Sequence, residues 1–208
     1  FNGSETFSVS VSDGEHTDSQ IITVTINAVN DAPVLSSVGD RDVDEDTSLN
    51  FLLSAFDVEG DALIYNITSG TNVISTLAGN DLTFTPAQDF NGNESFTLTV
   101  SDGYLEDFEI FTLTVNAVND APVLAAVSDV SFNEDGSGST SLSGSDVDGD
   151  NLTYSITGGS DITAELTGSD VTFNAPQDFN GSEFFSVSVT DGEYTDSQII
   201  TVTVNAVN

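Results

Sequence analysis

The chain repeats itself with a period of 89 residues, and this periodicity limits what it can fold into. The tripeptide Phe-Asn-Gly begins at Phe1, Phe90 and Phe179. The hexapeptide Asn-Asp-Ala-Pro-Val-Leu begins at Asn30 and again at Asn119. Self-similarity at a fixed period is typical of proteins built from serial modules, in which each repeat folds as a similar unit.

The repeat also sets the expected domain boundaries. Residues 1–30 match residues 179–208 at 26 of 30 positions, so they correspond to the C-terminal half of a truncated module. Two whole modules are expected over 31–119 and 120–208, each within the usual size range of a domain. The half module is too small to bury a core alone. We expect its other half to lie upstream in a longer chain, with strand addition from another chain as the alternative.

The charge balance excludes several kinds of partner. The chain has 35 Asp and Glu residues but a single basic residue, Arg41, and its formal net charge is -34. Binding to nucleic acid depends on Lys and Arg that neutralise phosphates, so we expect no nucleic-acid partner. Disorder often accompanies such a charge imbalance, but a hydrophobic content of 38% and 14 Phe residues indicate a folded chain.

Other common sources of stability and activity are missing from the sequence. Cysteine is absent, so the chain has neither disulfides nor thiol chemistry, and a secreted module of this kind needs another stabiliser, such as a metal ion. No apolar run approaches the length that a membrane crossing requires, so we expect no direct membrane insertion. The only histidine, His16, lies in the half module and no nucleophile has a partnered base, so we expect no catalytic residues and no enzyme activity.

Apolar and hydroxyl residues alternate in several segments, which indicates strands with one buried and one solvated face. An example is Phe96-Thr97-Leu98-Thr99-Val100. The alternation and the Gly, Asn and Asp turn signals predict seven strands in the first whole module: Val34–Ser37, Thr47–Ala55, Ala62–Ile67, Val73–Leu77, Leu82–Thr85, Ser95–Ser101 and Glu109–Asn116. Seven short antiparallel strands predict an all-β fold, a tandem array of Greek-key β-sandwiches of immunoglobulin-like shape.

Acidic residues recur with the period of the modules and concentrate in the expected turns. Asp146-Val147-Asp148-Gly149-Asp150 places three carboxylates at alternate positions around a glycine, where several oxygens can converge on a hard cation. An EF-hand is excluded, because position twelve of the loop is Thr157 and a strand-like run follows. By contrast, we interpret Asp18, Asp107 and Asp196, which follow Asp-Gly turns, as solvated loop charges.

These motifs resemble those of the cadherin-like repeats found in tandem in large bacterial surface proteins and adhesins. Such repeats carry a Glu near the first strand, an Asp-x-Asp loop, an Asp-Gly turn and a linker of the form Asp-x-Asn-Asp-Asn-x-Pro. The linker Asn116-Ala117-Val118-Asn119-Asp120-Ala121-Pro122 departs from this form at Asn116 and Val118. These two changes remove ligand charge and put a full cluster of three ions in doubt.

The resemblance implies Ca²⁺ as the cofactor and assigns its ligands. The joint before the first whole module would use Asn30, Asp31, Asp57, Glu59 and Asp102. The next joint would use Glu45 and Asp89 from the module before it, and Asn119, Asp120, Asp146, Asp148 and Asp191 from the linker and the module after it. Glu134 matches Glu45 in the second whole module.

The leading functional hypothesis is a Ca²⁺-stiffened spacer, which forms the stalk or filament shaft of an extracellular bacterial adhesin. Its partners would be neighbouring repeats in the same chain and, in a filament, like chains. One alternative is an adhesion module that binds carbohydrate or protein. Another is salt adaptation, in which the acidic surface keeps a halophilic protein soluble without specific metal sites.

Overall fold

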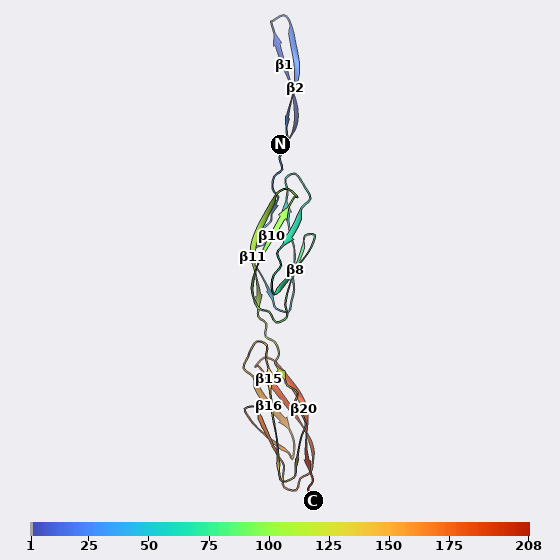
Figure 1. The fold of residues 1–208 in the computed structure, drawn as a ribbon, viewed down its shortest axis with the longest axis vertical. Coiled ribbons are helices and arrows are strands. Elements are labelled where there is room, and N and C mark those ends of the chain that lie inside the picture. The colour runs from blue at the N-terminus through green and yellow to red at the C-terminus, as the bar shows by residue number, and fades with distance from the viewer. Residues whose placement is uncertain (1) are drawn as a thin grey trace. The chain divides into compact units, whose positions relative to one another are not determined.

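The computed structural model describes residues 2–208, so Phe1, the first residue of the expected half module, lies outside the described part. The chain divides into two compact units, one ending at Ala117 and one spanning Val118–Asn208. We call them unit 1 and unit 2. All regular structure in the described residues is β-strand (Figure 1). None of these residues forms a helix of the length and apolarity needed to cross a membrane.

Unit 1 begins with an antiparallel hairpin and continues with a sandwich. The hairpin consists of β1 (Gly3–Ser12) and β2 (Thr17–Ile26), which are hydrogen-bonded to each other. The sandwich strands are β3 (Val34–Leu35), β4 (Arg41–Asp44), β5 (Leu49–Leu52), β6 (Ala55–Phe56), β7 (Ile64–Ile67), β8 (Val73–Ala78), β9 (Asp81–Pro86), β10 (Gly92–Ser101) and β11 (Glu106–Asn116). They form a four-stranded sheet of order β4-β11-β10-β7, a three-stranded sheet of order β5-β9-β8, and the short pair β3-β6.

Unit 2 repeats this arrangement. Its strands are β12 (Val123–Leu124), β13 (Val130–Asn133), β14 (Ser137–Ser141), β15 (Gly144–Ser145), β16 (Thr153–Gly158), β17 (Thr163–Thr167), β18 (Asp170–Asn174), β19 (Gly181–Thr190) and β20 (Thr195–Asn205). The sheets have the orders β13-β20-β19-β16 and β14-β18-β17, with β12 paired to β15. In both units one edge strand is parallel to its neighbour, since β4 pairs with β11 and β13 with β20.

The core of each sandwich is built from the apolar positions of the alternating strands. In β10, Phe96, Leu98 and Val100 are fully buried, while Thr97 and Thr99 between them lie on the other face and are partly exposed. Aromatic rings connect the two sheets, because Phe84 of β9 lies 4.6 Å from Phe96 of β10, centroid to centroid. In unit 2, Phe173 of β18 and Phe185 of β19 are 5.1 Å apart in an edge-to-face arrangement. Buried aromatic pairs of this geometry stabilise a core beyond the area that they bury.

The expected all-β tandem sandwich fold is confirmed, but two strand predictions need correction. The expected strand Thr47–Ala55 is two strands, β5 and β6, separated by the buried Leu53 and by Ser54. The sequence reading also missed β4, because Arg41-Asp42-Val43-Asp44 contains one apolar residue among three charged ones. Val43 nevertheless packs into the core, and the Arg41 guanidinium lies 5.1 Å from the centroid of the Phe51 ring.

Candidate metal sites at the module ends

An acidic loop follows β6 in unit 1. Asp57 is 6% exposed, and its Oδ1 accepts hydrogen bonds from the backbone N–H groups of Glu59 (3.0 Å) and Asp61 (3.1 Å). The turn between them passes through Gly60, which has a φ of 77°, a left-handed value that glycine adopts without strain. The second carboxylate oxygen, Asp57 Oδ2, is buried and has no hydrogen-bond partner among the described residues. Most buried polar atoms in folded proteins have a hydrogen-bond partner, so this oxygen is an exception.

The linker and the β10–β11 turn bring further oxygens to the same loop. Asn30 Nδ2 donates to Asp102 Oδ2 at 2.7 Å, and the backbone N–H of Asp31 donates to Glu59 Oε2 at 3.3 Å. Asp102 Oδ1 accepts two backbone N–H groups of its own turn, each at 2.7 Å. The structure therefore brings together five predicted ligands at one end of the sandwich: Asn30, Asp31, Asp57, Glu59 and Asp102.

The hydrogen bonds to Asp102 keep its side chain charged. The N–H of Leu105, the amide of Asn30 and the N–H of Tyr104 lower the pKa of Asp102 below its usual value, because each donor stabilises the carboxylate. An ionised carboxylate is the form that coordinates a hard cation. Asp102 is therefore ionised at neutral pH.

Unit 2 contains the same arrangement 89 residues later. Asp146 Oδ1 accepts the backbone N–H groups of Asp148 (3.0 Å) and Asp150 (3.3 Å), and Asp146 Oδ2 is buried without a hydrogen-bond partner. Asn119 Nδ2 donates to Asp191 Oδ2 at 3.0 Å, and the N–H of Asp120 donates to Asp148 Oδ2 at 2.8 Å. Burial disfavours the charged form of Asp191 and raises its pKa. The hydrogen bonds that its carboxylate accepts, the strongest from the Tyr194 N–H, outweigh the effect of burial, so the pKa is lower than usual.

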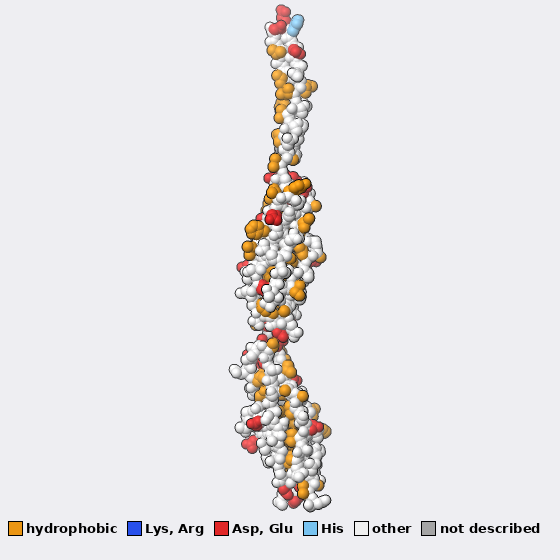
Figure 2. Space-filling model, viewed as in Figure 1, with side chains coloured by type: hydrophobic (Ala, Val, Ile, Leu, Met, Phe, Trp, Pro, Cys, Tyr) orange, Lys and Arg blue, Asp and Glu red, His pale blue; other side chains and the backbone are white. Residues whose placement is uncertain are grey.

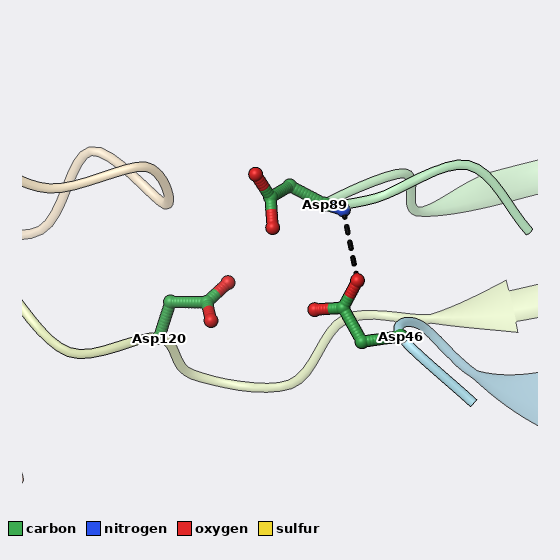
Figure 3. Close-up of side chains that lie close together, drawn as sticks. All are labelled: Asp46, Asp89 and Asp120. Atoms are coloured by element: carbon green, nitrogen blue, oxygen red, sulfur yellow. Dashed lines mark hydrogen bonds between the residues drawn. The ribbon is translucent and has the colours of Figure 1, made fainter.

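The remaining predicted ligands lie at the other end of each sandwich. In unit 1, Asn91 Nδ2 donates to Glu45 Oε2 at 3.5 Å, and the N–H of Asp89 donates to Asp46 Oδ1 at 3.2 Å (Figure 3, which also draws Asp120 of unit 2). Asn91 and Asp102 flank the ten-residue β10, so the two ends are roughly 30 Å apart at about 3.3 Å per residue. Glu45 and Asp89 therefore do not join the Asp57 cluster of their own unit. Glu134 corresponds to Glu45 in unit 2, and its Oε1 accepts the N–H of Val207 at 2.7 Å.

The sequence reading missed Asp46 and its repeat Asp135. Both adopt left-handed backbone conformations, as do their partners Asp89 and Asp178, with φ between 55° and 60°. Asp178 N–H donates to Asp135 Oδ1 at 3.3 Å, which reproduces the pair in unit 1. The 89-residue recurrence of an acid at this position is the sequence signal for it, since the family motif does not include this position.

The interpretation of Asp107 and Asp196 as solvated loop charges is wrong. Asp107 Oδ2 accepts the backbone N–H of Leu35 at 2.9 Å, and Asp196 Oδ2 accepts that of Leu124 at 2.8 Å. Each carboxylate thus fastens the first short strand of its sandwich to the last long one. The partners are 72 residues apart, so local sequence could not reveal the contact.

Comparison with known domain families identifies the family of the two sandwiches. The pattern of one domain family, described as a bacterial Ig domain, matches the chain twice, over residues 30–116 and 119–203. The two matches together cover more than half of the chain. The chain belongs to the bacterial Ig domain family. The expected resemblance to immunoglobulin-like tandem repeats of bacterial proteins is therefore confirmed.

Solved structures similar to these bacterial Ig domains include cadherin repeats. Human Protocadherin-24 EC1-2 has a TM-score of 0.53 and 18% identity, covering 86% of this chain and 100% of that one. PcdhgB3 EC1-4 has a TM-score of 0.58 and 13% identity, covering 100% of this chain and 58% of that one. At these identities the likeness concerns the fold alone, which is cadherin-like as expected.

A curated relative also contains part of this sequence pattern. Chitinase A of Pseudoalteromonas piscicida is 29% identical over 130 residues, covering 61% of this chain. The match spans 16% of that protein's length. The two bacterial Ig domains in series support a structural or adhesion-type repeat.

Proposed function

We propose that this chain is a structural repeat array whose module ends bind Ca²⁺, and that the bound ion stiffens the joints. The observation that carries the proposal is the buried, unpartnered oxygen of Asp57, which recurs at Asp146. Each oxygen belongs to a cluster of carboxylate and amide groups on loops and a linker. The donor set is all oxygen, as Ca²⁺ prefers, and it fits an ion that takes six to eight such ligands.

The residues of each cluster would share the ligand role. In unit 1 they are Asn30, Asp31, Asp57, Glu59 and Asp102, and in unit 2 they are Asn119, Asp120, Asp146, Asp148 and Asp191. Glu45, Asp89 and Glu134 would serve the following joint. Carboxylates gathered at one place repel one another, and a bound Ca²⁺ supplies the positive charge that they lack. The chain's own hydrogen bonds, such as Asn30 to Asp102, already hold the linker against the module that follows it.

The setting that suits this chemistry is extracellular. Extracellular modules bind Ca²⁺ with dissociation constants of about 10⁻⁴ to 10⁻³ M, so such joints would stiffen once outside the cell. We propose the stalk or filament shaft of a bacterial surface protein or adhesin, with no catalytic role for these modules. The bacterial Ig domain family and the serial repetition of similar modules support this role.

A calorimetric melt with matched variants tests the proposal. The chain is melted in chelator, in millimolar Ca²⁺, and in chelator with molar NaCl, alongside Asp57→Asn, Asp146→Asn and the control Asp42→Asn. Asp42 is an exposed acid outside both clusters, and its substitution removes the same charge. With a Kd of about 10⁻⁴ to 10⁻³ M, 1 mM Ca²⁺ is expected to add about 0.4–1.4 kcal/mol to the stability of each unit that binds one ion.

Each variant is expected to lose the Ca²⁺ response of its own unit, while Asp42→Asn keeps the response of both. An equal upward shift in NaCl would instead indicate general screening of an acidic surface. In that case the chain would be salt-adapted and the calcium proposal would fail.

A further inference from the structure

The outer face of the four-stranded sheet in unit 1 carries two large apolar side chains. Phe108 and Ile110 are 61% and 65% exposed. They are alternate residues of β11, so they lie on the same face, about 6.6 Å apart along the strand. The core of the sandwich is filled from the other face of this strand, by Phe111, Leu113 and Val115. Phe108 and Ile110 therefore lie on the solvent side of the sheet.

Unit 2 also has a Phe and an Ile on the corresponding face, but its Phe comes from a different strand. Ile199 of β20 is 75% exposed, and Phe184 of β19 is 69% exposed. Ile199 pairs with Ser186, which follows Phe184 by two residues on the same face of β19. Phe184 and Ile199 are therefore diagonal neighbours on adjacent strands, within reach of one another.

Neither exposed Phe belongs to the repeated sequence. The residue equivalent to Phe108 in unit 2 is Ser197, and the residue equivalent to Phe184 in unit 1 is Ser95. Single apolar residues scattered over a surface are ordinary. Here, however, an exposed Phe lies beside an exposed Ile on the same sheet face of both units, through a different residue in each. This recurrence indicates a role for the face that core packing does not explain.

Uncharged polar side chains surround each apolar pair. In unit 1 the strand register places Thr99 beside Phe108 and Thr97 beside Ile110, with Asn66 on the far side of Thr99. The equivalent positions of unit 2 carry hydroxyl groups: Ser188, Ser186 and Ser155. Figure 2 shows hydrophobic side chains lying among uncharged atoms on the surfaces of both units. Each face thus combines an apolar platform with hydrogen-bonding groups.

The size and the charge of the face limit what can bind there. An exposed Phe and Ile offer on the order of 200 Å² of apolar area, whereas each partner in a stable protein interface buries roughly 800 Å². The apolar pair is therefore too small to hold a second protein chain. On the described strands β10 and β11, the face has a single charged residue, Glu106, so ion pairs supply little affinity. A chain with a net charge of -34 also repels anionic polymers.

A neutral polysaccharide has the chemistry that remains. The face of an aromatic ring carries a partial negative charge, which attracts the weakly positive C–H groups of a sugar ring. The side chains of Ser, Thr and Asn can exchange hydrogen bonds with the hydroxyl groups at the edges of the sugar. Among such polymers, β-1,4-linked chains are extended and flat, which suits an open sheet face, whereas α-1,4-linked chains coil.

We infer that the outer faces of the two four-stranded sheets bind a neutral β-1,4-linked polysaccharide. Phe108 and Phe184 stack on the sugar rings, and Ile110 and Ile199 extend the apolar contact. The hydroxyl and amide groups of the neighbouring strands bind the edges of the sugars. This inference is independent of Ca²⁺ binding, and it gives the repeat array a ligand in addition to its structural role.

Titration calorimetry with cellohexaose, a soluble β-1,4-linked glucan, tests the inference in the presence of chelator. Phe108→Ser, Phe184→Ser and the double variant give each unit the residue that the other unit already has at that position, and a melt checks that they are folded. The matched control is Phe56→Ser. Phe56 is 67% exposed on β6, outside this sheet, and its equivalent in unit 2 is Ser145.

The parent and Phe56→Ser are expected to bind one hexasaccharide per unit. Each single variant is expected to lose binding in its own unit, and the double variant is expected to bind none. Retention on microcrystalline cellulose is expected to follow the same order, and amylose, an α-1,4-linked glucan, is expected to retain none of the chains.

These measurements decide the inference in either direction. If the parent binds neither cellohexaose nor cellulose, or if the double variant binds as the parent does, the sheet faces are not polysaccharide sites. If Phe56→Ser loses as much binding as the double variant, or if amylose retains the parent equally, the binding is general hydrophobic adsorption. Either result overturns the inference.

Discussion

At the scale of single residues, the acidic side chains have two different roles. Asp57 and Asp146 each keep one buried oxygen free of hydrogen bonds, whereas Glu94 and Glu183 use their carboxylates to fasten loops. Sequence spacing predicted that acids gather at the turns, but it did not distinguish these roles. The distinction depends on which backbone N–H groups lie nearby, and many of these belong to distant segments. Asp196, with a partner 72 residues away, is the clearest example.

Glu183 predicts a specific acid sensitivity of unit 2. Hydrogen bonds led by the Asp161 N–H lower its pKa below the ordinary 4.5, although burial opposes this shift. A carboxyl group whose pKa is lower in the folded state than in the unfolded state contributes its full stabilisation at pH values above the unfolded-state pKa. This stabilisation is lost as the pH falls through the folded-state pKa. The melting temperature of unit 2 is therefore expected to fall below about pH 4.5.

Glu183→Gln measures this contribution directly. At pH 7 it is expected to lower the stability of unit 2 by about 1–3 kcal/mol, because backbone N–H donors lose a charged acceptor. Below pH 4.5, the stability of unit 2 in the Glu183→Gln variant is expected to change less with pH than the stability of unit 2 in the parent. Glu165→Gln, at an exposed acid on β17, is the control. An unchanged pH profile in Glu183→Gln would contradict the assignment.

At the scale of elements, period-two alternation predicted the long strands well and the short edge strands poorly. β10 and β11 both contain the expected cores of Ser95–Ser101 and Glu109–Asn116 but begin three residues earlier. These first residues pair with the neighbouring strand without being buried, and they do not continue the period-two alternation of the strand cores, since the one apolar residue among them, Phe108, is exposed. β4 was missed because backbone pairing to β11, and not side-chain pattern, defines it.

Phe7 and Phe185 occupy the same position in the β1–β2 and β19–β20 hairpins, so they test how much the burial of a side chain contributes to the stability of a sandwich. Phe185→Ala is expected to destabilise unit 2 by about 3–5 kcal/mol, since the side chain is 1% exposed and packs on Phe173. Phe7→Ala, at the same hairpin position but 48% exposed, is expected to leave the melting of both sandwiches unchanged. Chemical denaturation of both variants measures the difference. Equal losses would mean that the hairpin face is covered in the free chain.

At the scale of the whole molecule, the 89-residue period was the most informative feature of the sequence. It predicted that any site at a module end would recur, and Asp57 and Asp146 do share the same hydrogen-bond pattern and the same unpartnered oxygen. The boundaries 1–30, 31–119 and 120–208 remain a prediction. Sequence could not show how the two units move relative to each other, because that depends on whether the acidic groups at a joint repel or share a cation.

Small-angle X-ray scattering of the whole chain tests the central claim of Ca²⁺ stiffening most directly. Profiles are recorded in chelator, in millimolar Ca²⁺ and in NaCl of matched ionic strength, for the parent and for Asp146→Asn. Ca²⁺ is expected to narrow the range of conformations of the parent and to lengthen it. NaCl is expected to do neither, and Asp146→Asn is expected to remove the Ca²⁺ effect. Identical profiles of the parent in Ca²⁺ and NaCl would contradict the claim.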